Sequence, residues 1–463
     1  MAASTYLSKT WGQAPTNGKK CTISLWMHLA PNSNSSNQYY RIWSSNTGDA
    51  NDRADLNMTD PSLDGAGAGQ INFTLATGGN QYVWGTQNKF VDMATWYHLV
   101  FAYDSTQASA SDRLKLYING VQQSFSSEPT LPQDTIIQFS KNGVEQWIGN
   151  SPHYSPRFFH GTMSHFHFID GTAYTPSTFG STDATTGEWK INTSPSVTYG
   201  NNGFLIMKDG NTITDQSSNS NNWSLAAGTL TNVQDNPSNA FCTMHPMNGV
   251  GTATYKVDNC GTTVGDSGSG DNDCGMTGTL GMESGKYYWE VKAVNAGGVL
   301  GIKNSDVGIA ASMTDGSPNA GYWGFQSNGS GASLNTYNNG TFNNSNTLQG
   351  HANNDIVMIA VDMDNGKLFY GRNGSWLGAD GNAADPAAGT NAIATNIPQD
   401  GTFMLPWTEH RSSGDPESHF NFGNGYFGTT AVSSAGTNAS NIGVFEYDVP
   451  TGFTALSTKG LNN

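Results

Sequence analysis

The sequence has little charge, little cysteine and no long apolar run. Charged residues make up 12% of the 463 residues, and eight glutamates stand against 28 aspartates. Aspartate suits turns and glutamate suits helices, so this balance disfavours long solvated helices. Nowhere does the chain approach the roughly 18 uninterrupted apolar residues of a membrane-spanning helix. A helical bundle and a helical membrane protein are therefore both poor interpretations.

Basic residues are also scarce, at 20 against 36 acidic residues, which gives a formal net charge of −16. Such a surface repels phosphate polymers and anionic membranes, so we expect neither nucleic acid nor a membrane as a partner. The N-terminal residues lack the basic and apolar regions of a signal peptide. We expect a soluble protein that is made in the cytoplasm.

The four cysteines, Cys21, Cys242, Cys260 and Cys274, form no CxxC pair and no zinc-ligand spacing. Cys260 and Cys274 flank a polar loop whose closure by a disulfide would stabilise the fold by about 3 kcal/mol. Cytoplasmic synthesis favours two free thiols instead. The sequence leaves this pairing open.

What the chain does contain is glycine, at 56 residues, and aromatic residues, at 11%. Many glycines among aromatic residues indicate short strands joined by tight turns. The length is enough for two or three domains that each bury a core. We therefore predict an all-β protein.

Alternating segments fill residues 20–180. Cys21, Ile23, Leu25 and Met27 alternate with polar and aromatic residues, so one face of this strand should lie in a core. The segment Trp96–Asp104 is apolar on both faces, as a central strand would be. The segment Leu114–Ser124 follows, and its Asn119-Gly120 pair fits a two-residue type I′ hairpin.

The order of these segments, completed by Trp147–Gly180, resembles the laminin-G-like jelly roll of the concanavalin A type. That resemblance implies recognition of carbohydrate or protein, sometimes with calcium, and in some relatives glycoside hydrolysis. Hydrolysis needs two carboxylates that face one sugar, which laminarinase-like relatives carry as ExDxxE. The nearest approach is Glu446-Tyr447-Asp448, with Thr451 in place of the last glutamate. We expect no catalytic residues and no enzyme activity.

Four histidines, His153, His160, His165 and His167, are candidate metal ligands because His165 and His167 should share one face of a strand. Asp170 is the only carboxylate or thiol at ligand spacing beside them. Ordinary strand or loop histidines are the better interpretation, so we predict no metal here.

Residues 181–239 are rich in Ser, Thr, Asn and Gly, with one strand-like segment at Gly203–Gly210. This segment is too apolar for a free tether, so we expect the region to add strands or to pack against a module. Asp215–Leu225 and Asp235–Met247 resemble the connectors before SPRY-like modules in structural proteins of tailed phages. With Phe168–Gly180, they suggest a phage protein.

A second set of strand signals begins at Lys286–Ala293. It continues at Val307–Ser312 and Gly321–Gly329, and then at Ile356–Gly378, where Asn365-Gly366 and Asn373-Gly374 predict two hairpin turns. With strands near Phe403 and Phe420, this order resembles the SPRY sandwich. The ending Tyr447–Thr458 resembles the closing strand of phage versions.

Two features of this second region are tempting as binding sites. Trp289, Trp323 and Trp376 could stack on sugars, but each lies in a strand motif, so we expect core positions. The acidic stretch Asp266–Asp273 offers oxygen ligands for calcium but lacks regular ligand spacing and a terminal glutamate. We expect a polar loop there, with calcium as the open alternative and no other cofactor.

The sequence thus predicts two tandem β-sandwich (jelly-roll) domains at residues 1–180 and 240–463, joined by a connecting region at 181–239. We expect a non-enzymatic virion structural protein of a bacteriophage, namely a tail or head fibre or a capsid decoration protein, displayed on the virion surface. Its expected partners are other virion proteins and a host-surface glycan or protein, bound by a homo-oligomer, most simply a trimer. A secreted bacterial lectin or adhesin is the alternative, and a glycoside hydrolase fits less well. The residues of the binding loops are not identifiable from the sequence.

Overall fold

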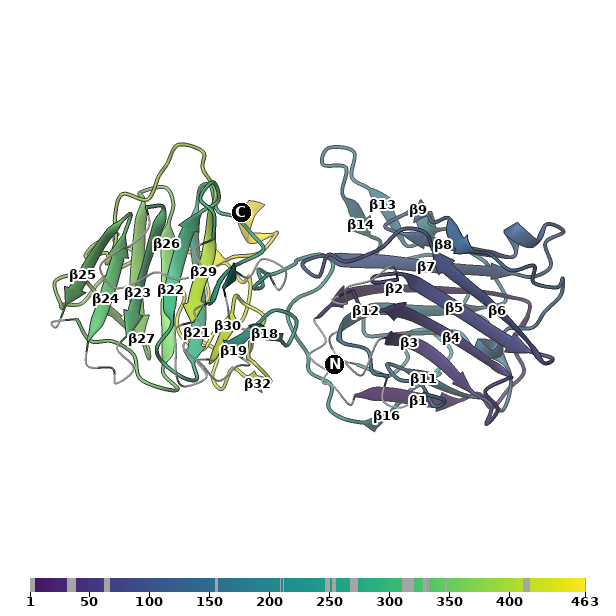
Figure 1. Ribbon diagram of the computed structural model, residues 1–463. Helices are drawn as coiled ribbons and strands as arrows, with labels where there is room; N and C mark the ends of the chain where they lie inside the picture. Colours follow the sequence, from purple (N-terminus) through teal and green to yellow (C-terminus); the bar gives the residue numbers. More distant parts are fainter. Residues whose placement is uncertain are drawn as a thin grey trace. The chain divides into compact units, whose positions relative to one another are not determined.

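The alternating segments of the sequence form strands, and the strands build two tandem β-sandwiches in a computed structural model (Figure 1). One unit comprises residues 1–232 and 236–238, and the other comprises residues 233–235 and 239–463. The residues that the structure describes are 5–30, 39–61, 67–154, 157–208, 210, 212–245, 250–251, 255–266, 274–309, 320–327, 331, 333–345, 348–410 and 417–462.

Helix is confined, among these described residues, to four single 3-10 turns. They are η1 (Ala110–Asp112), η2 (Gln138–Ser140), η3 (Pro176–Thr178) and η4 (Gly460–Asn462). None of the described helices has the length and apolar character needed to cross a membrane.

The first unit contains an eight-stranded antiparallel sheet and a six-stranded antiparallel sheet. The eight-stranded sheet has the order β10 (Phe125–Ser127), β6 (Asn80–Thr86), β5 (Ile71–Thr77), β4 (Arg53–Thr59), β3 (Tyr39–Asn46), β11 (Glu145–Ile148), β1 (Tyr6–Thr10), β16 (Ser224–Ala227). The six-stranded sheet has the order β15 (Phe204–Ile206), β12 (Gly161–Asp170), β2 (Lys20–Leu29), β7 (Trp96–Asp104), β8 (Leu114–Ile118), β9 (Val121–Gln122). A separate hairpin joins β13 (Gly180–Thr182) and β14 (Trp189–Ile191).

The predicted faces of this unit are confirmed. Cys21, Ile23, Leu25 and Met27 of β2 lie in one buried cluster that takes residues from both large sheets. Strand β7 is central, between β2 and β8. Asn119 and Gly120 have φ values of 48° and 79°, which a type I′ turn requires.

Residues 181–232 belong to the first unit instead of forming a separate connector. Strand β15 pairs with β12 at one edge of the six-stranded sheet, and β16 pairs with β1 at one edge of the eight-stranded sheet. Phe204 and Ile206 of β15 are fully buried. The apolar character of this strand therefore serves the core of the first unit.

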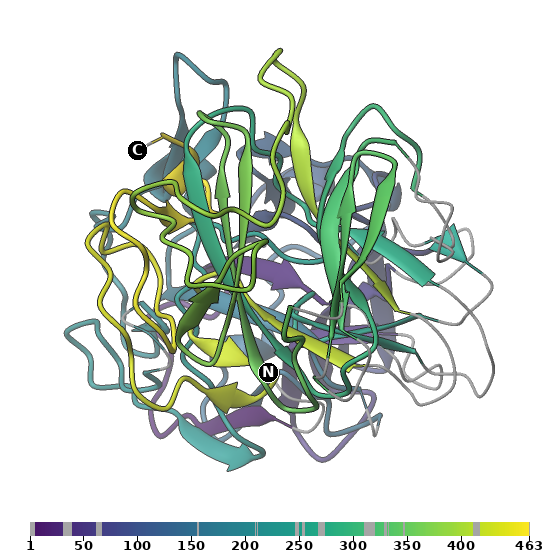
Figure 2. The ribbon, with the colours of Figure 1, turned by 90° about the vertical axis from the view of Figure 1, so that its left-hand side faces the viewer.

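The second unit also packs two sheets face to face (Figure 2). The seven-stranded sheet has the order β17 (Val250–Gly251), β20 (Cys274–Thr277), β29 (Met404–His410), β22 (Val299–Asn304), β23 (Tyr322–Ser327), β24 (Leu334–Asn338), β25 (Thr341–Ser345). The eight-stranded sheet has the order β18 (Tyr255–Asp258), β19 (Thr263–Asp266), β30 (Glu417–Asn421), β21 (Lys286–Ala293), β26 (Ile356–Asp362), β27 (Lys367–Arg372), β28 (Ser375–Leu377). Strand β33 (Thr454–Ala455) runs parallel to β21, and β31 (Tyr426–Phe427) pairs with β32 (Thr430–Ala431).

Two sequence-based expectations for the second unit are wrong. The expected strand at Val307–Ser312 does not begin at Val307, since residues 307–309 are not in a strand and residues 310–312 lie outside the described residues. The strand of this region is β22, which begins at Val299, eight residues before the expected start at Val307. Between β26 and β27, Asn365 lacks the positive φ of a two-residue turn, so a four-residue loop, 363–366, makes the hairpin.

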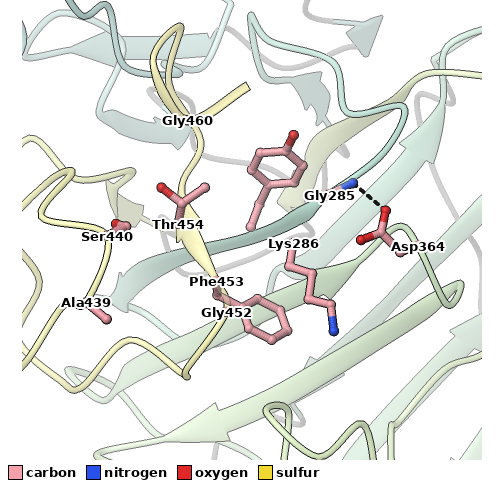
Figure 3. A pocket seen from close by; sticks show the side chains of 10 residues that line it. Gly285, Lys286, Asp364, Ala439, Ser440, Gly452, Phe453, Thr454 and Gly460 are labelled. Atoms are coloured by element: carbon pink, nitrogen blue, oxygen red, sulfur yellow. Dashed lines mark hydrogen bonds between the residues drawn. The ribbon is translucent and has the colours of Figure 1, made fainter. Parts of the chain in front are cut away.

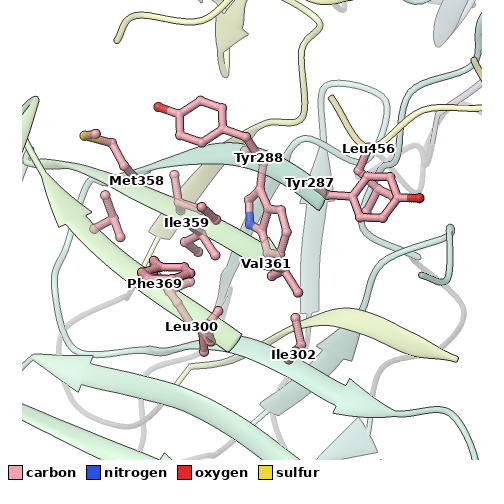
Figure 4. Packing of buried hydrophobic residues seen from close by; sticks show 14 of the residues in the cluster. Tyr287, Tyr288, Leu300, Ile302, Met358, Ile359, Val361, Phe369 and Leu456 are labelled. Carbon is pink, nitrogen blue, oxygen red and sulfur yellow. The ribbon is translucent and has the colours of Figure 1, made fainter. Parts of the chain in front are cut away.

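The core of the second unit is continuous between its sheets. Figure 4 shows Leu300 and Ile302 of one sheet facing Val361 and Phe369 of the other. These four side chains are at most 1% exposed. Such burial is worth roughly 1.5–3 kcal/mol per large apolar side chain, which makes both sheets one folding unit.

Candidate functional site

The outer face of the eight-stranded sheet in the first unit is polar although it is buried. Antiparallel pairing places Trp147 of β11, Ser44 of β3 and Asp55 of β4 in one row. Residues that pair directly across antiparallel strands point to the same side of a sheet. The adjacent positions Trp43 and Leu56 point into the core. The polar row therefore lies on the side away from the core.

Arg41 joins this outer face because β3 contains a bulge. The register with β4 shifts between Arg41 and Trp43, so Ile42 and Trp43 are both fully buried in the core. Arg41 and Ser44 are three residues apart, and in an unbroken strand they would point to opposite sides. The bulge brings both to the polar side.

Two of the arginines on this face share one carboxylate. The Nε of Arg53 lies 2.7 Å from Oδ2 of Asp55, and Nη1 of Arg41 lies 3.6 Å from Oδ1. Arg53 also donates to the carbonyl oxygen of Ala50. Burial lowers the pKa of Arg41; the charge of Asp55 opposes this, and the charges of Arg157 and Arg53 lower the pKa further.

A third arginine, Arg157, reaches the same place from the segment after β11. Its guanidinium carbon lies 4.4 Å from the ring centre of Tyr154 and 4.6 Å from that of Tyr39. The guanidiniums of Arg41 and Arg53 also lie within 5.4 Å of the ring centre of Tyr154. We call this group the arginine–tyrosine cluster; its members are Tyr39, Arg41, Arg53, Asp55, Tyr154 and Arg157.

The arginine–tyrosine cluster concentrates positive charge in an acidic protein. It holds three of the six arginines of the chain and one aspartate, while the whole chain has a formal net charge of −16. Like charges held together in a buried place raise the free energy of the fold unless an anion compensates them. This makes the cluster a candidate site for a negatively charged ligand.

Buried polar atoms without a hydrogen-bond partner gather on and beside this face. This statement covers the described residues only. On the sheet they are Nε of Arg41, Oγ of Ser44, Oδ1 of Asp55, Oδ1 of Asn57 and Nε1 of Trp147, and the segment between β11 and Tyr154 adds Oγ of Ser151 and Nε2 of His153. They offer both donors and acceptors, as the hydroxyl groups of a sugar require.

The outer face of the six-stranded sheet is, in contrast, used for packing. The indole Nε1 of Trp189 donates to Nδ1 of His98 at 2.9 Å, and the ring of Trp26 stacks on the imidazole. Since Nδ1 accepts, the proton of a neutral His98 is on Nε2, which donates to Oγ of Ser24 at 2.9 Å. Burial lowers the pKa of His98 to about 3, which agrees with a neutral ring.

The prediction that His165 and His167 share one face of a regular strand is wrong. A bulge interrupts β12 between Ser164 and His167, and His165 has a φ of 47°, so simple alternation does not apply. His165 contacts Oγ of Ser164 at 2.8 Å, and His167 contacts the hydroxyl of Tyr199 at 2.9 Å. The described residues contain no group of three or more His, Cys, Asp or Glu side chains arranged to hold a metal ion.

A shallow pocket of about 460 Å³ lies in the second unit (Figure 3). Lys286 of β21 forms an ion pair with Asp362 at 3.0 Å and lies 5.7 Å from the ring centre of Phe453. The backbone N–H of Gly285 donates to Asp364. These charged groups already have partners inside the unit. The pocket is therefore a weaker candidate for a ligand site than the arginine–tyrosine cluster.

The carboxylates nearest to a hydrolase motif hold loops together. Glu446 accepts hydrogen bonds from Ser433, and Asp448 accepts them from Thr437. The backbone N–H groups of Glu446 and Tyr447 donate to the buried carboxylate of Glu290, at 2.9 and 2.8 Å. These residues are occupied in fixing the C-terminal segment to β21.

The remaining candidates are mostly core residues. Trp289 and Trp323 are each 1% exposed, and Trp376 is partly buried against the same core.

Cys260 is a free thiol, and burial raises its pKa to about 11. The side chain of Cys274 and most of the acidic stretch, residues 267–273, lie outside the described residues.

The arginine–tyrosine cluster could not be predicted from the sequence. Its members come from β3, β4 and the segment after β11, so their spacing along the chain shows no motif. The one usable signal in the sequence was the scarcity of arginine, because four of the six arginines lie between residues 41 and 157 and two of these, Arg41 and Arg157, lie within three residues of a tyrosine.

Family comparisons agree with this two-part architecture. Residues 4–177 match a laminin-G-type family model described as the concanavalin A-like lectin/glucanases superfamily, and residues 286–385 match the SPRY domain model. The predicted order of the two domains is thereby confirmed. No curated protein sequence matches this chain.

Three solved structures resemble parts of the chain. The SPRY domain of human HERC1 is 19% identical, covering 38% of this chain and 96% of its own, with a TM-score of 0.28. The TRIM65 PSpry domain is 15% identical, covering 39% of this chain and 91% of its own, with a TM-score of 0.28. A heptameric SAP-like pentraxin from Limulus polyphemus is 14% identical, covering 37% of this chain and 71% of its own, with a TM-score of 0.26.

Proposed function

We propose that this protein is a non-enzymatic recognition protein, a structural component of a bacteriophage particle that binds a host-surface glycan or protein. The lectin-like and SPRY domains support the coarser part of this proposal, a role in binding carbohydrate or protein. The observation that carries it is the outer face of the eight-stranded sheet, with its buried polar atoms and its partly exposed tyrosines and arginine.

Binding without turnover is supported by the chemistry of the arginine–tyrosine cluster. Glycoside hydrolysis requires two carboxyl groups about 5 to 9 Å apart on either side of a sugar. The arginines of the cluster contact one carboxylate among the described residues, Asp55, and both of its oxygens lie next to guanidinium groups. One carboxylate cannot supply both of the groups that this chemistry requires.

We therefore expect no release of reducing sugar when the purified protein is incubated with β-glucans or with acidic polysaccharides. Reducing-end assays over several hours, with a β-glucanase as the positive control, measure this. Reproducible turnover would contradict the proposal, and its loss in an Asp55→Asn variant would place an active site at the cluster.

The phage assignment rests on the resemblance of residues 168–180, 215–225, 235–247 and 447–458 to segments of phage structural proteins. Antibody labelling of purified particles in the electron microscope tests it. Label at the tail, at a fibre or on the capsid supports a virion component. Absence of the protein from particles, together with its presence in the medium of a bacterial culture, would favour a secreted lectin or adhesin.

A further inference from the structure

We propose that the arginine–tyrosine cluster binds the anionic group of an acidic sugar, a carboxylate or a sulfate. This inference rests on the proposed recognition function and adds the chemical class of its ligand. Its starting point is a charge imbalance, because three guanidiniums gather at the ring of Tyr154 with one carboxylate, Asp55, beside two of them, in a protein that is otherwise strongly acidic.

A purely structural role explains only part of the cluster. Arg53 and Asp55 are neighbours on β4 and form a close ion pair, and Arg41 links that pair to β3. Arg157 contributes no such bond: among the described residues it contacts only the rings of Tyr39 and Tyr154. A guanidinium has five N–H donors, so the donors of Arg157 are available to a ligand.

The members of the cluster differ in how far they are exposed to solvent. Tyr39, Tyr154 and Arg157 are partly exposed, whereas Arg41 and Arg53 are 4% and 6% exposed. An anion from solvent can therefore reach Arg157 more readily than the two buried guanidiniums. The rings already hold the guanidiniums by cation–π contact, so their side chains need little further ordering on binding.

The geometry of guanidinium donors favours an oxyanion. Arginine presents two parallel N–H groups that match the two oxygens of a carboxylate or of a sulfate, and such charge-assisted pairs are stronger than neutral hydrogen bonds. Oγ of Ser44 and Nε1 of Trp147 are buried on the same face and lack partners among the described residues. These groups suit the hydroxyls of the sugar that carries the anion.

A single acidic sugar fits this protein better than a nucleic acid does. Nucleic-acid binding requires several phosphate contacts spread along a basic surface, and the net charge of −16 opposes such a surface. A localised cluster with an excess of two positive charges can accept one or two anionic groups at close range. The acidic character of the chain as a whole then disfavours longer polyanions.

The test is isothermal titration of the full chain at low salt with three sets of oligosaccharides, namely oligogalacturonate, sulfated galactose oligomers and neutral galactose oligomers. We expect binding of an acidic set and weakening by about tenfold or more in Arg157→Gln, from loss of a charge-assisted bond. Arg157→Lys keeps the charge but loses the paired N–H groups of the guanidinium. Its affinity should lie between those of the unchanged protein and Arg157→Gln. Preference for the carboxylated or for the sulfated set identifies the anionic group.

Lys190→Gln is the matched control, because it removes one positive charge at an exposed ion pair elsewhere in the same unit. It should leave the affinity unchanged. Equal binding of neutral and acidic sets, or acidic binding that Arg157→Gln does not weaken, would overturn the inference while the recognition function stands. Failure to bind any acidic set, or preferential binding of single-stranded DNA, would overturn it as well, whereas the particle labelling tests the phage role independently.

Discussion

Glu290 is a carboxylate that the fold buries completely among hydrogen-bond donors. It accepts from the hydroxyl of Tyr288, the amide of Asn421 and the backbone N–H groups of Glu446 and Tyr447. These donors stabilise the ionised form, but burial outweighs them and raises the pKa of Glu290 to about 7. A carboxyl group with a raised pKa is bound to its proton more tightly in the folded state than in the unfolded chain.

This shift makes the stability of the second unit depend on pH. The contribution of Glu290 is fully present below about pH 4.5 and declines as the pH rises to about 7, by roughly 3 kcal/mol in total. Glu290→Gln replaces the carboxyl group by a neutral amide that does not titrate, so it should flatten the decline of the free energy of unfolding between pH 5 and 7. Urea unfolding at several pH values measures this effect. A decline of unchanged slope in the variant would contradict the assignment.

At the scale of elements, the hairpin between β8 and β9 supports a neighbouring hairpin. Gly120 has a φ of 79°, and a Cβ at this position would overlap the indole ring of Trp189 on β14. That ring is fixed by its hydrogen bond to His98, so it cannot easily move away. The turn and the β13–β14 hairpin therefore depend on one another.

We expect Gly120→Ala to destabilise the first unit by more than the cost of placing an alanine at a positive φ. The matched control is Gly143→Ala, at a φ of 74° with open space where the Cβ would lie. The control should cost about 1 kcal/mol from the left-handed conformation, and Gly120→Ala should cost about 1–3 kcal/mol more from the overlap. Chemical denaturation followed by tryptophan fluorescence measures both variants. Equal losses would show that Trp189 moves freely.

At the scale of the whole molecule, we expect several copies to act together. A single shallow site binds a sugar weakly, and display of several linked sites can raise avidity by roughly 10² to 10⁴ without a new contact. Closed symmetry is the usual arrangement of soluble assemblies. The prediction is a trimer, with about three times the 49.2 kDa mass of the chain.

Light scattering coupled to size-exclusion chromatography measures this mass at micromolar concentration. A monomer under these conditions, combined with isolated single copies on the particle, would contradict multivalent display. The two folds and the arginine–tyrosine cluster would be unaffected by that result.

Local patterns along the chain were sufficient to predict the class of the fold and the order of its two domains. Alternation in Cys21–Met27 predicted which side chains enter the core, and the Asn119-Gly120 pair predicted a turn. Both predictions succeeded because strand faces and tight turns depend on residues that are neighbours along the chain. The tertiary structure alone decided the candidate site. Arg41 reaches the polar face only through a bulge, and Arg157 meets it from a distant segment. Neither the extra residue of a bulge nor a contact across more than a hundred residues leaves a period in the sequence.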